Sequence, residues 1–180
     1  EEMSEYEVNE LSMRAEEAIK SVVKHALSTM NESTEAVDLD GDSPSIIRWV
    51  AYNDPNTLKS ATDELFELLG TEYADVSIIA LSALAKRRDS TGQTVTNQLI
   101  ATVNIDENLM RGTRNNDPSS SLERAEDALE ALIRANRTRE CTRYVIERAD
   151  EWLNADSVEL HEHALTQLRT LAEREPETVN

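Results

Sequence analysis

Long hydrophobic runs, glycine, proline and aromatic residues are all scarce in this chain of 180 residues. No window approaches the ~18 consecutive apolar residues that a membrane-spanning helix needs, so we expect no membrane segment. The chain holds four glycines and four prolines, and aromatic residues make up only 4% of it. Ala, Leu, Glu and Arg dominate instead, and this composition favours helix over sheet.

Cysteine and targeting signals are equally limited. The single cysteine, Cys141, excludes an internal disulfide. The first ten residues, EEMSEYEVNE, are acidic and lack the basic-then-apolar order of a secretory signal. We therefore expect a cytoplasmic protein, and the length suits one domain with a sizeable core.

Lysine is the scarcest of the charged residues. The chain has 36 acidic and 18 basic residues, a formal net charge of −18, and only four of the bases are lysines. Such a charge repels itself strongly in dilute salt, whereas molar salt shortens the Debye length to ~3 Å and removes most of the repulsion. This composition resembles that of proteins from salt-accumulating microbes, haloarchaea above all. An acidic mesophilic protein is the alternative.

The apolar residues recur with a helical period from end to end. A stripe from Val8 to Met30 predicts one long helix of about seven turns, followed by an acidic linker. Ser43-Pro44 predicts a helix start, and Asp54-Pro55 and Gly70 predict the two ends of the next helix. The segment 74–88 is apolar on most sides, which predicts a central helix.

The second half of the chain continues the helical pattern with one interruption. Residues 93–103 predict a weaker helix, and residues 104–120 predict the longest irregular stretch of this half. Ser120, Thr138 and Asp156 then predict the starts of three final helices. Short connections between these helices indicate antiparallel neighbours. We divide the chain into residues 1–42, a long helix plus acidic linker, and residues 43–180, a helical domain that packs with that helix as one unit.

Four predicted helices share a Leu-x-x-Leu pattern. The copies read ELFEL from Glu64, ALSAL from Ala80, ALEAL from Ala128 and ALTQL from Ala164. The chain thereby resembles the HEAT and armadillo class of helical repeats over residues 54–174, although the spacing from Leu81 to Leu129 does not fit one repeat length. The fold is thus predicted to be all-α, with antiparallel hairpins stacked as a HEAT-like array or as an irregular helical bundle. The resemblance implies partner binding in general.

Motifs for metal, nucleotide and nucleophilic chemistry are missing or incomplete. The stretch DLDGDSP from Asp38 has ligand types at positions 1, 3 and 5 of an EF-hand, but Ser43 and Trp49 stand where glycine and the bidentate glutamate belong. His161 and His163 lie about 200° apart on a helix and cannot share an ion. We expect His161 to be partly buried and hydrogen-bonded, and His163 to face solvent. No Walker A, G-x-G-x-x-G or G-x-S-x-G motif occurs. We expect no metal, no cofactor and no enzyme.

One segment departs from the acidity of the rest. Residues 111–148 hold eight arginines and seven acids, and four of those arginines surround one predicted helix–helix turn: Arg134, Arg137, Arg139 and Arg143. They form either a docking patch for an anionic partner, nucleic-acid backbone or an acidic protein surface, or arginines that balance nearby glutamates within their own helices. Arg148, between Tyr144 and Trp152, is expected to stack on those rings.

A helical chain without recognisable catalytic, nucleotide-binding or metal-binding motifs is typical of a non-catalytic protein–protein interaction or scaffold module. A protein partner is therefore the leading expectation. The alternatives are a nucleic-acid-associated protein that binds through the arginines, and an oligomeric regulatory or structural subunit with the long first helix as its dimerising element.

The acidic, lysine-poor composition predicts that the fold depends on high salt. We expect the helical circular dichroism to fall when KCl is lowered below roughly 1 M, because the unscreened repulsion then exceeds a marginal free energy of folding. A titration of the far-ultraviolet signal against KCl measures this. Full helicity in dilute buffer would contradict it.

Overall fold

Eight α-helices and one 3-10 helix make up the part of the chain that the computed structural model describes, residues 5–32, 42–112, 118–135, 139–155 and 158–174. No strand occurs within these ranges, so the predicted all-α class is confirmed. The elements are α1 (Glu5–Glu32), α2 (Asp42–Asn53), η1 (Pro55–Ala61), α3 (Thr62–Glu67), α4 (Ala74–Ala85), α5 (Ser90–Gly112), α6 (Pro118–Ala135), α7 (Arg139–Leu153) and α8 (Val158–Arg174).

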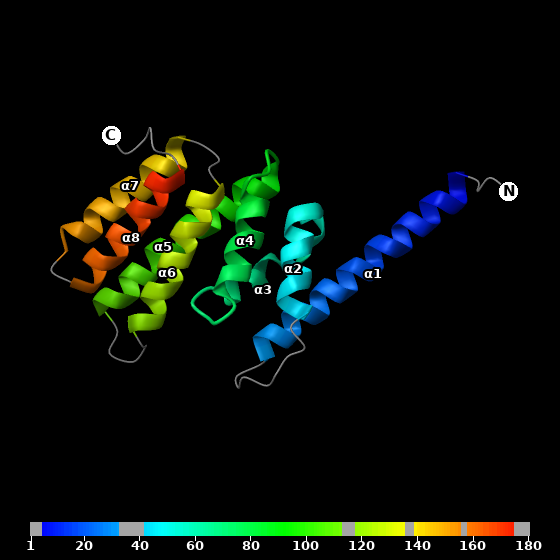
Figure 1. Ribbon diagram of the computed structural model, residues 1–180, viewed down its shortest axis with the longest axis horizontal. Helices are drawn as coiled ribbons and strands as arrows, with labels where there is room; N and C mark the ends of the chain where they lie inside the picture. The colour runs from blue at the N-terminus through cyan, green and yellow to red at the C-terminus, as the bar shows by residue number, and fades with distance from the viewer. Residues whose placement is uncertain (1–4, 33–41, 113–117, 136–138, 156–157, 175–180) are drawn as a thin grey trace.

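The elements follow one another in chain order along the long axis of the molecule, from α1 at one end to α7 and α8 at the other (Figure 1). Helix α5 packs against α6, α7 packs against α8, and α6 also contacts α4 and α8. One cluster of buried apolar side chains extends from Val23 in α1 to Leu171 in α8. None of the described helices is both long and apolar enough to cross a membrane.

Helix α4 is the centre of this arrangement, as its apolar sequence predicted. It contacts α2, η1, α3, α5 and α6. Even its two buried serines have hydrogen bonds, because Ser77 donates to the Leu65 carbonyl at 2.6 Å and Ser82 to the Ile79 carbonyl at 2.8 Å. The buried residues of α4 are Val76, Ser77, Ile78, Ala80, Leu81, Ser82, Leu84 and Ala85.

The single helix predicted between Asp54-Pro55 and Gly70 is wrong in its detail. The segment forms η1 and then the short helix α3, with a backbone break at Ala61, whose φ of −119° and ψ of 21° are not helical. The Thr62 hydroxyl donates to the Lys59 carbonyl at 2.9 Å at this junction. Gly70 is not the C-cap that the sequence predicted, because α3 ends at Glu67 and Leu68 caps it. Gly70 lies in the turn that follows, with a φ of 76°, which glycine adopts readily.

The irregular stretch predicted for residues 104–120 is also wrong. Helix α5 continues to Gly112, and α6 begins at Pro118 rather than at the predicted Ser120. Asn104, Asp106 and Asn108 have weak helix propensity, which suggested a loop, but residues 104–111 contain neither proline nor glycine. Packing of α5 on α6 outweighs that propensity.

The Leu-x-x-Leu copies are not equivalent in the structure. Both leucines are buried in the first three copies, whereas in the fourth Leu165 is 58% exposed and Leu168 only partly buried. Helix α8 is the last element and packs on α6 and α7 only, so its outer face has no neighbour among the described helices. A helical array is observed, and a regular repeat is not.

Helix α8 is held by few deeply buried side chains. They are Ala164, Gln167 and Leu171, and Gln167 is polar. Its Nε2 donates to the Glu126 carbonyl at 3.4 Å, a long hydrogen bond. Its Oε1 is buried and accepts no hydrogen bond from the described residues.

The backbone passes close to itself in the turn between α4 and α5. Gly92 is buried in the first turn of α5, and a Cβ atom on it would lie 2.1 Å from the Arg87 carbonyl oxygen. The Gly92 amide donates to the Asp89 carboxylate at 3.1 Å. Because the obstacle is backbone, no side-chain rotation relieves it.

Gly92→Ala is therefore expected to lower the free energy of unfolding by about 1–3 kcal/mol, since α5 must move away from the end of α4. Urea unfolding monitored by circular dichroism measures this. The control is Thr94→Ala, an exposed position two residues further along α5, which is expected to stay within about 0.5 kcal/mol. Equal effects of the two substitutions would contradict the role of the contact.

The turn after α3 is fastened to α6 by a carboxylate. The Gly70 amide donates to the Asp127 carboxylate at 2.8 Å. Partial burial raises the pKa of Asp127 to about 6, and the charges of Glu126, Glu130 and Glu123 act in the same direction, although the Gly70 hydrogen bond opposes them. Asp127 is itself only partly buried, and no Asp or Glu among the described residues is fully buried.

Asp127 keeps its proton up to about pH 6 in the folded chain but loses it near pH 4 when unfolded. The folded state thus binds more protons in this window, and the contribution of Asp127 to stability falls as the pH rises through it. Asp127→Asn keeps an acceptor for Gly70 and is expected to raise the free energy of unfolding at pH 7.5 by on the order of 1 kcal/mol, after allowance for its exposed part. The gain should vanish at pH 4. Urea unfolding at the two pH values measures this, and an equal gain at both would contradict it.

Candidate partner-binding groove

A groove of about 380 Å³ lies between α2, the start of η1, α4 and the end of α6. We call it the α2–α4 groove. Its apolar part consists of Ala51, Pro55, Ile79 and Ala83, small or aliphatic residues that leave the space open. Ser82 also lines it, but its hydroxyl already donates to the Ile79 carbonyl. The groove therefore offers an apolar floor of the size that accepts a small ligand or a few side chains.

The rim of the α2–α4 groove carries an aromatic ring and two cations. Tyr52 is 74% exposed at the end of α2. Lys86 follows the last turn of α4 and is exposed, with no ion pair to another described residue. Arg134 extends from the last turn of α6, where its guanidinium contacts Glu130 at 2.7 Å. A guanidinium has five N–H donors, so this one acid does not exhaust it.

The structure places only two of the four arginines that the sequence singled out. Arg134 lines the α2–α4 groove. Arg143 lies on α7, with its side chain 72% exposed and 3.7 Å from Glu147. Arg137 and the side chain of Arg139 lie outside the described residues. Both described arginines have a glutamate four residues away in their own helix, so the intrahelical pairing considered for them occurs.

Arg148 belongs to the packing of α7 on α5. Its guanidinium lies 5.6 Å from the centroid of the Tyr144 ring, as predicted, and its side chain is only 11% exposed. It donates to the Asn104 side chain at 2.6 Å and to Glu151 at 2.6 Å. Tyr144 contributes a second hydrogen bond to Asn104, at 3.2 Å. This arginine holds two helices together.

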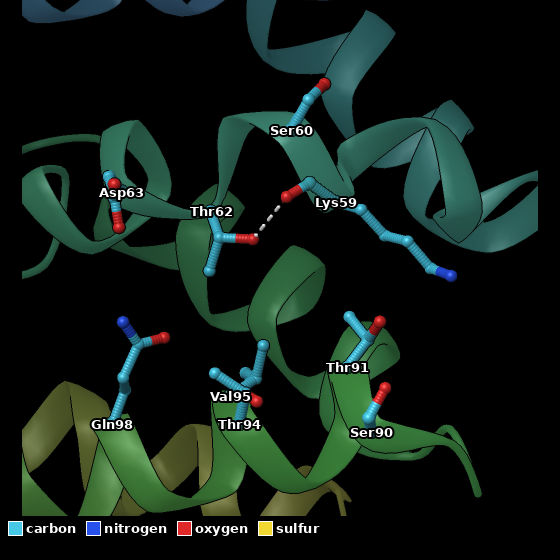
Figure 2. A pocket seen from close by; sticks show the side chains of 9 residues that line it. All are labelled: Lys59, Ser60, Thr62, Asp63, Ser90, Thr91, Thr94, Val95 and Gln98. Carbon is cyan, nitrogen blue, oxygen red and sulfur yellow. Dashed lines mark hydrogen bonds between the residues drawn. The ribbon is translucent and has the colours of Figure 1, made fainter.

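A second hollow, of about 330 Å³, separates η1 and α3 from the first turns of α5 (Figure 2). Its lining is polar, with five hydroxyl side chains around Lys59, Asp63, Val95 and Gln98; the hydroxyls are those of Ser60, Thr62, Ser90, Thr91 and Thr94. The Gln98 Oε1 atom is buried without a hydrogen-bond partner among the described residues. The arrangement suits water or a small neutral polar molecule.

The carboxylate of Asp89 lies beside this second hollow and balances the charge of nearby cations. Its carboxylate accepts hydrogen bonds from Arg87, at 2.5 and 3.0 Å, and from the Gly92 amide, and Lys59 lies 3.5 Å away. The Arg87 hydrogen bond and the Gly92 amide hold the pKa of Asp89 well below its usual range. The N-terminus of α5 is thereby occupied by the chain's own anion.

Of the two C-terminal histidines, His161 agrees with its prediction and His163 does not. His161 is partly buried, and its Nε2 lies 2.7 Å from the Ala155 carbonyl, as expected of a hydrogen-bonded histidine. His163 does not face solvent, because its Nδ1 contacts the Glu126 carboxylate and its side chain is 23% exposed. The expectation failed because α6 packs beside α8, which the helical wheel of α8 alone does not show. Within the described ranges, no three His, Cys, Asp or Glu residues gather in a way that could hold a metal ion.

Sequence reasoning missed the α2–α4 groove. Nothing in the local sequence distinguishes Ala51 and Ala83 from other small helical residues, and the groove exists because they lie side by side on adjacent helices. Trp49 and Tyr52 on α2 are 58% and 74% exposed in the structure, which the sequence of α2 alone does not show.

Comparison with known proteins identifies no relative: no protein-family model matches the chain, and neither the curated proteins nor the solved structures include a match. The resemblance to HEAT and armadillo repeats therefore stays an interpretation of the sequence pattern.

Proposed function

We propose that the protein is a non-catalytic interaction module that receives an acidic segment of a partner protein in the α2–α4 groove. The observation that carries this proposal is the pair of cations, Lys86 and Arg134, beside an apolar floor in a chain with a net charge of −18. A partner side chain that is apolar fits the floor, and a neighbouring carboxylate meets the cations.

The chemistry of the rim favours a carboxylate ligand over other groups. Arginine offers parallel N–H donors that match the two oxygens of a carboxylate, and lysine adds a point charge. Tyr52 supplies an exposed ring of the kind that anchors protein interfaces. Both Lys86 and Arg134 are donors, so the charged side chains of the groove suit an anionic group.

Nucleic acid is the runner-up, and the groove supports it less. Phosphate backbones are bound by several cations distributed along a surface. Arg143 is exposed on α7, but it lies outside the α2–α4 groove and beside Glu147. The composition that resembles haloarchaeal proteins is compatible with either partner, because molar salt screens the net charge.

A peptide-display selection on the immobilised full chain, at the lowest KCl that keeps it helical, tests the proposal. We expect enrichment of peptides with an acidic residue beside an apolar one. Lys86→Glu is expected to weaken the best peptide about tenfold, because it replaces a charge-assisted contact by repulsion. Ala83→Leu, which fills the floor, should also weaken it. Fluorescence anisotropy of the labelled peptide measures both.

Arg143→Glu is the matched control, since it makes the same charge change at an exposed arginine outside the groove. It should leave peptide binding unchanged. Equal losses with Lys86→Glu and Arg143→Glu would reduce the effect to net charge and contradict the groove. Binding of a labelled DNA duplex that falls steeply with salt and is lost in Arg143→Glu would favour the nucleic-acid reading instead.

A further inference from the structure

Residues 12–18 of α1 are exposed in the described part of the molecule. Figure 1 shows this helix projecting from the body beyond α2. Its buried residues all lie in its last turns: Val23, Ala26, Leu27 and Met30. At 1.5 Å per residue, the portion of α1 before Val23 is about 27 Å long.

Apolar residues continue along this projecting portion on a different face. Ala15, Ala18 and Val22 are exposed and spaced by three and four residues, and the sequence extends the same spacing back to Leu11 and Val8. We call Ala15, Ala18 and Val22 the α1 seam. At ~100° per residue, its direction lies roughly 100° around the helix from that of the four buried residues. Val22 is 49% exposed although its neighbour Val23 is buried.

The α1 seam is free of carboxylates in a helix that is rich in them. Glu10, Glu16 and Glu17 each point more than roughly 110° away from it. Toward the body the same face still carries an exposed residue, His25. A second helix can therefore lie along the seam without burying an unpaired acid.

These observations indicate what covers the seam. We infer that the seam of one chain packs against the seam of a second copy, forming a two-helix contact. A spacing of three and four is that of a coiled-coil seam, and the alanines at its centre let two backbones approach closely. An isologous contact pairs this acid-free strip with an equally acid-free strip, whereas an acidic or basic partner would find no opposite charge on it.

The size of the contact sets its strength. The seam is short, with two alanines and one valine per copy, so the contact buries less than the roughly 1,000 Å² of a stable specific interface. A weak, concentration-dependent dimer follows. Because each copy carries a net charge of −18, added salt lowers the repulsion between copies and strengthens the dimer. Binding in the α2–α4 groove has the opposite salt dependence, so the inference is independent of the proposed function.

Sedimentation velocity of the full chain in molar KCl, over a wide range of protein concentration, tests the inference. We expect a monomer–dimer equilibrium that Ala18→Glu weakens at least tenfold, because it places a charge in the seam. Met13→Glu is the matched control: it adds the same charge to the same helix, at an exposed position roughly 170° from the seam. It should leave the equilibrium unchanged. Circular dichroism of each variant confirms that α1 stays helical.

Three results would overturn the inference. A wild-type chain that remains monomeric at every concentration has no such contact. Equal weakening by Met13→Glu and Ala18→Glu shows that charge, and not the seam, controls association. A dimer that dissociates as KCl rises is held by ion pairs, which the seam does not contain.

Discussion

Helix α4 is buried over most of its circumference, and the arrangement of the other helices depends on covering it. A helix of twelve residues with eight buried must be enclosed by neighbours on several sides, and α2, η1, α3, α5 and α6 supply them. The tight turn at Gly92 follows from this constraint, because α5 must return along α4 immediately after it ends. The α2–α4 groove follows too: it is the place where α2 and α6 enclose α4 incompletely.

The fold class could be predicted because the helical period and the breakers agree along most of the chain. α4 was identified as central since its apolar residues cover most of its circumference, a property of its own sequence. The errors lie where packing overrides propensity. Residues 104–112 remain helical, and the Leu-x-x-Leu pattern of α8 does not mark a buried face because none of the described helices covers Leu165. A pattern of spacing cannot tell whether a neighbour exists.

The candidate site was predictable only in part, for the same reason. Arg134 was singled out as a cation in a less acidic segment, but its companion in the groove, Lys86, lies 48 positions earlier in the chain. The two residues come together only in the tertiary structure. Arg148 shows the converse, since its aromatic neighbour sits four residues away in the same helix and was foreseen. His163 was misjudged because its partner, Glu126, belongs to another helix.

The polar residue in the α8 contact has a consequence for how the molecule opens. An amide oxygen buried without a partner costs about 1–3 kcal/mol, and Gln167 lies between the two apolar residues that hold α8 most firmly. The detached helix recovers that loss by meeting water. Its amide hydrogens should therefore exchange with solvent long before those of α4, through an opening that leaves the centre of the molecule intact. Local stability is then expected to be highest around α4 and lowest in α8.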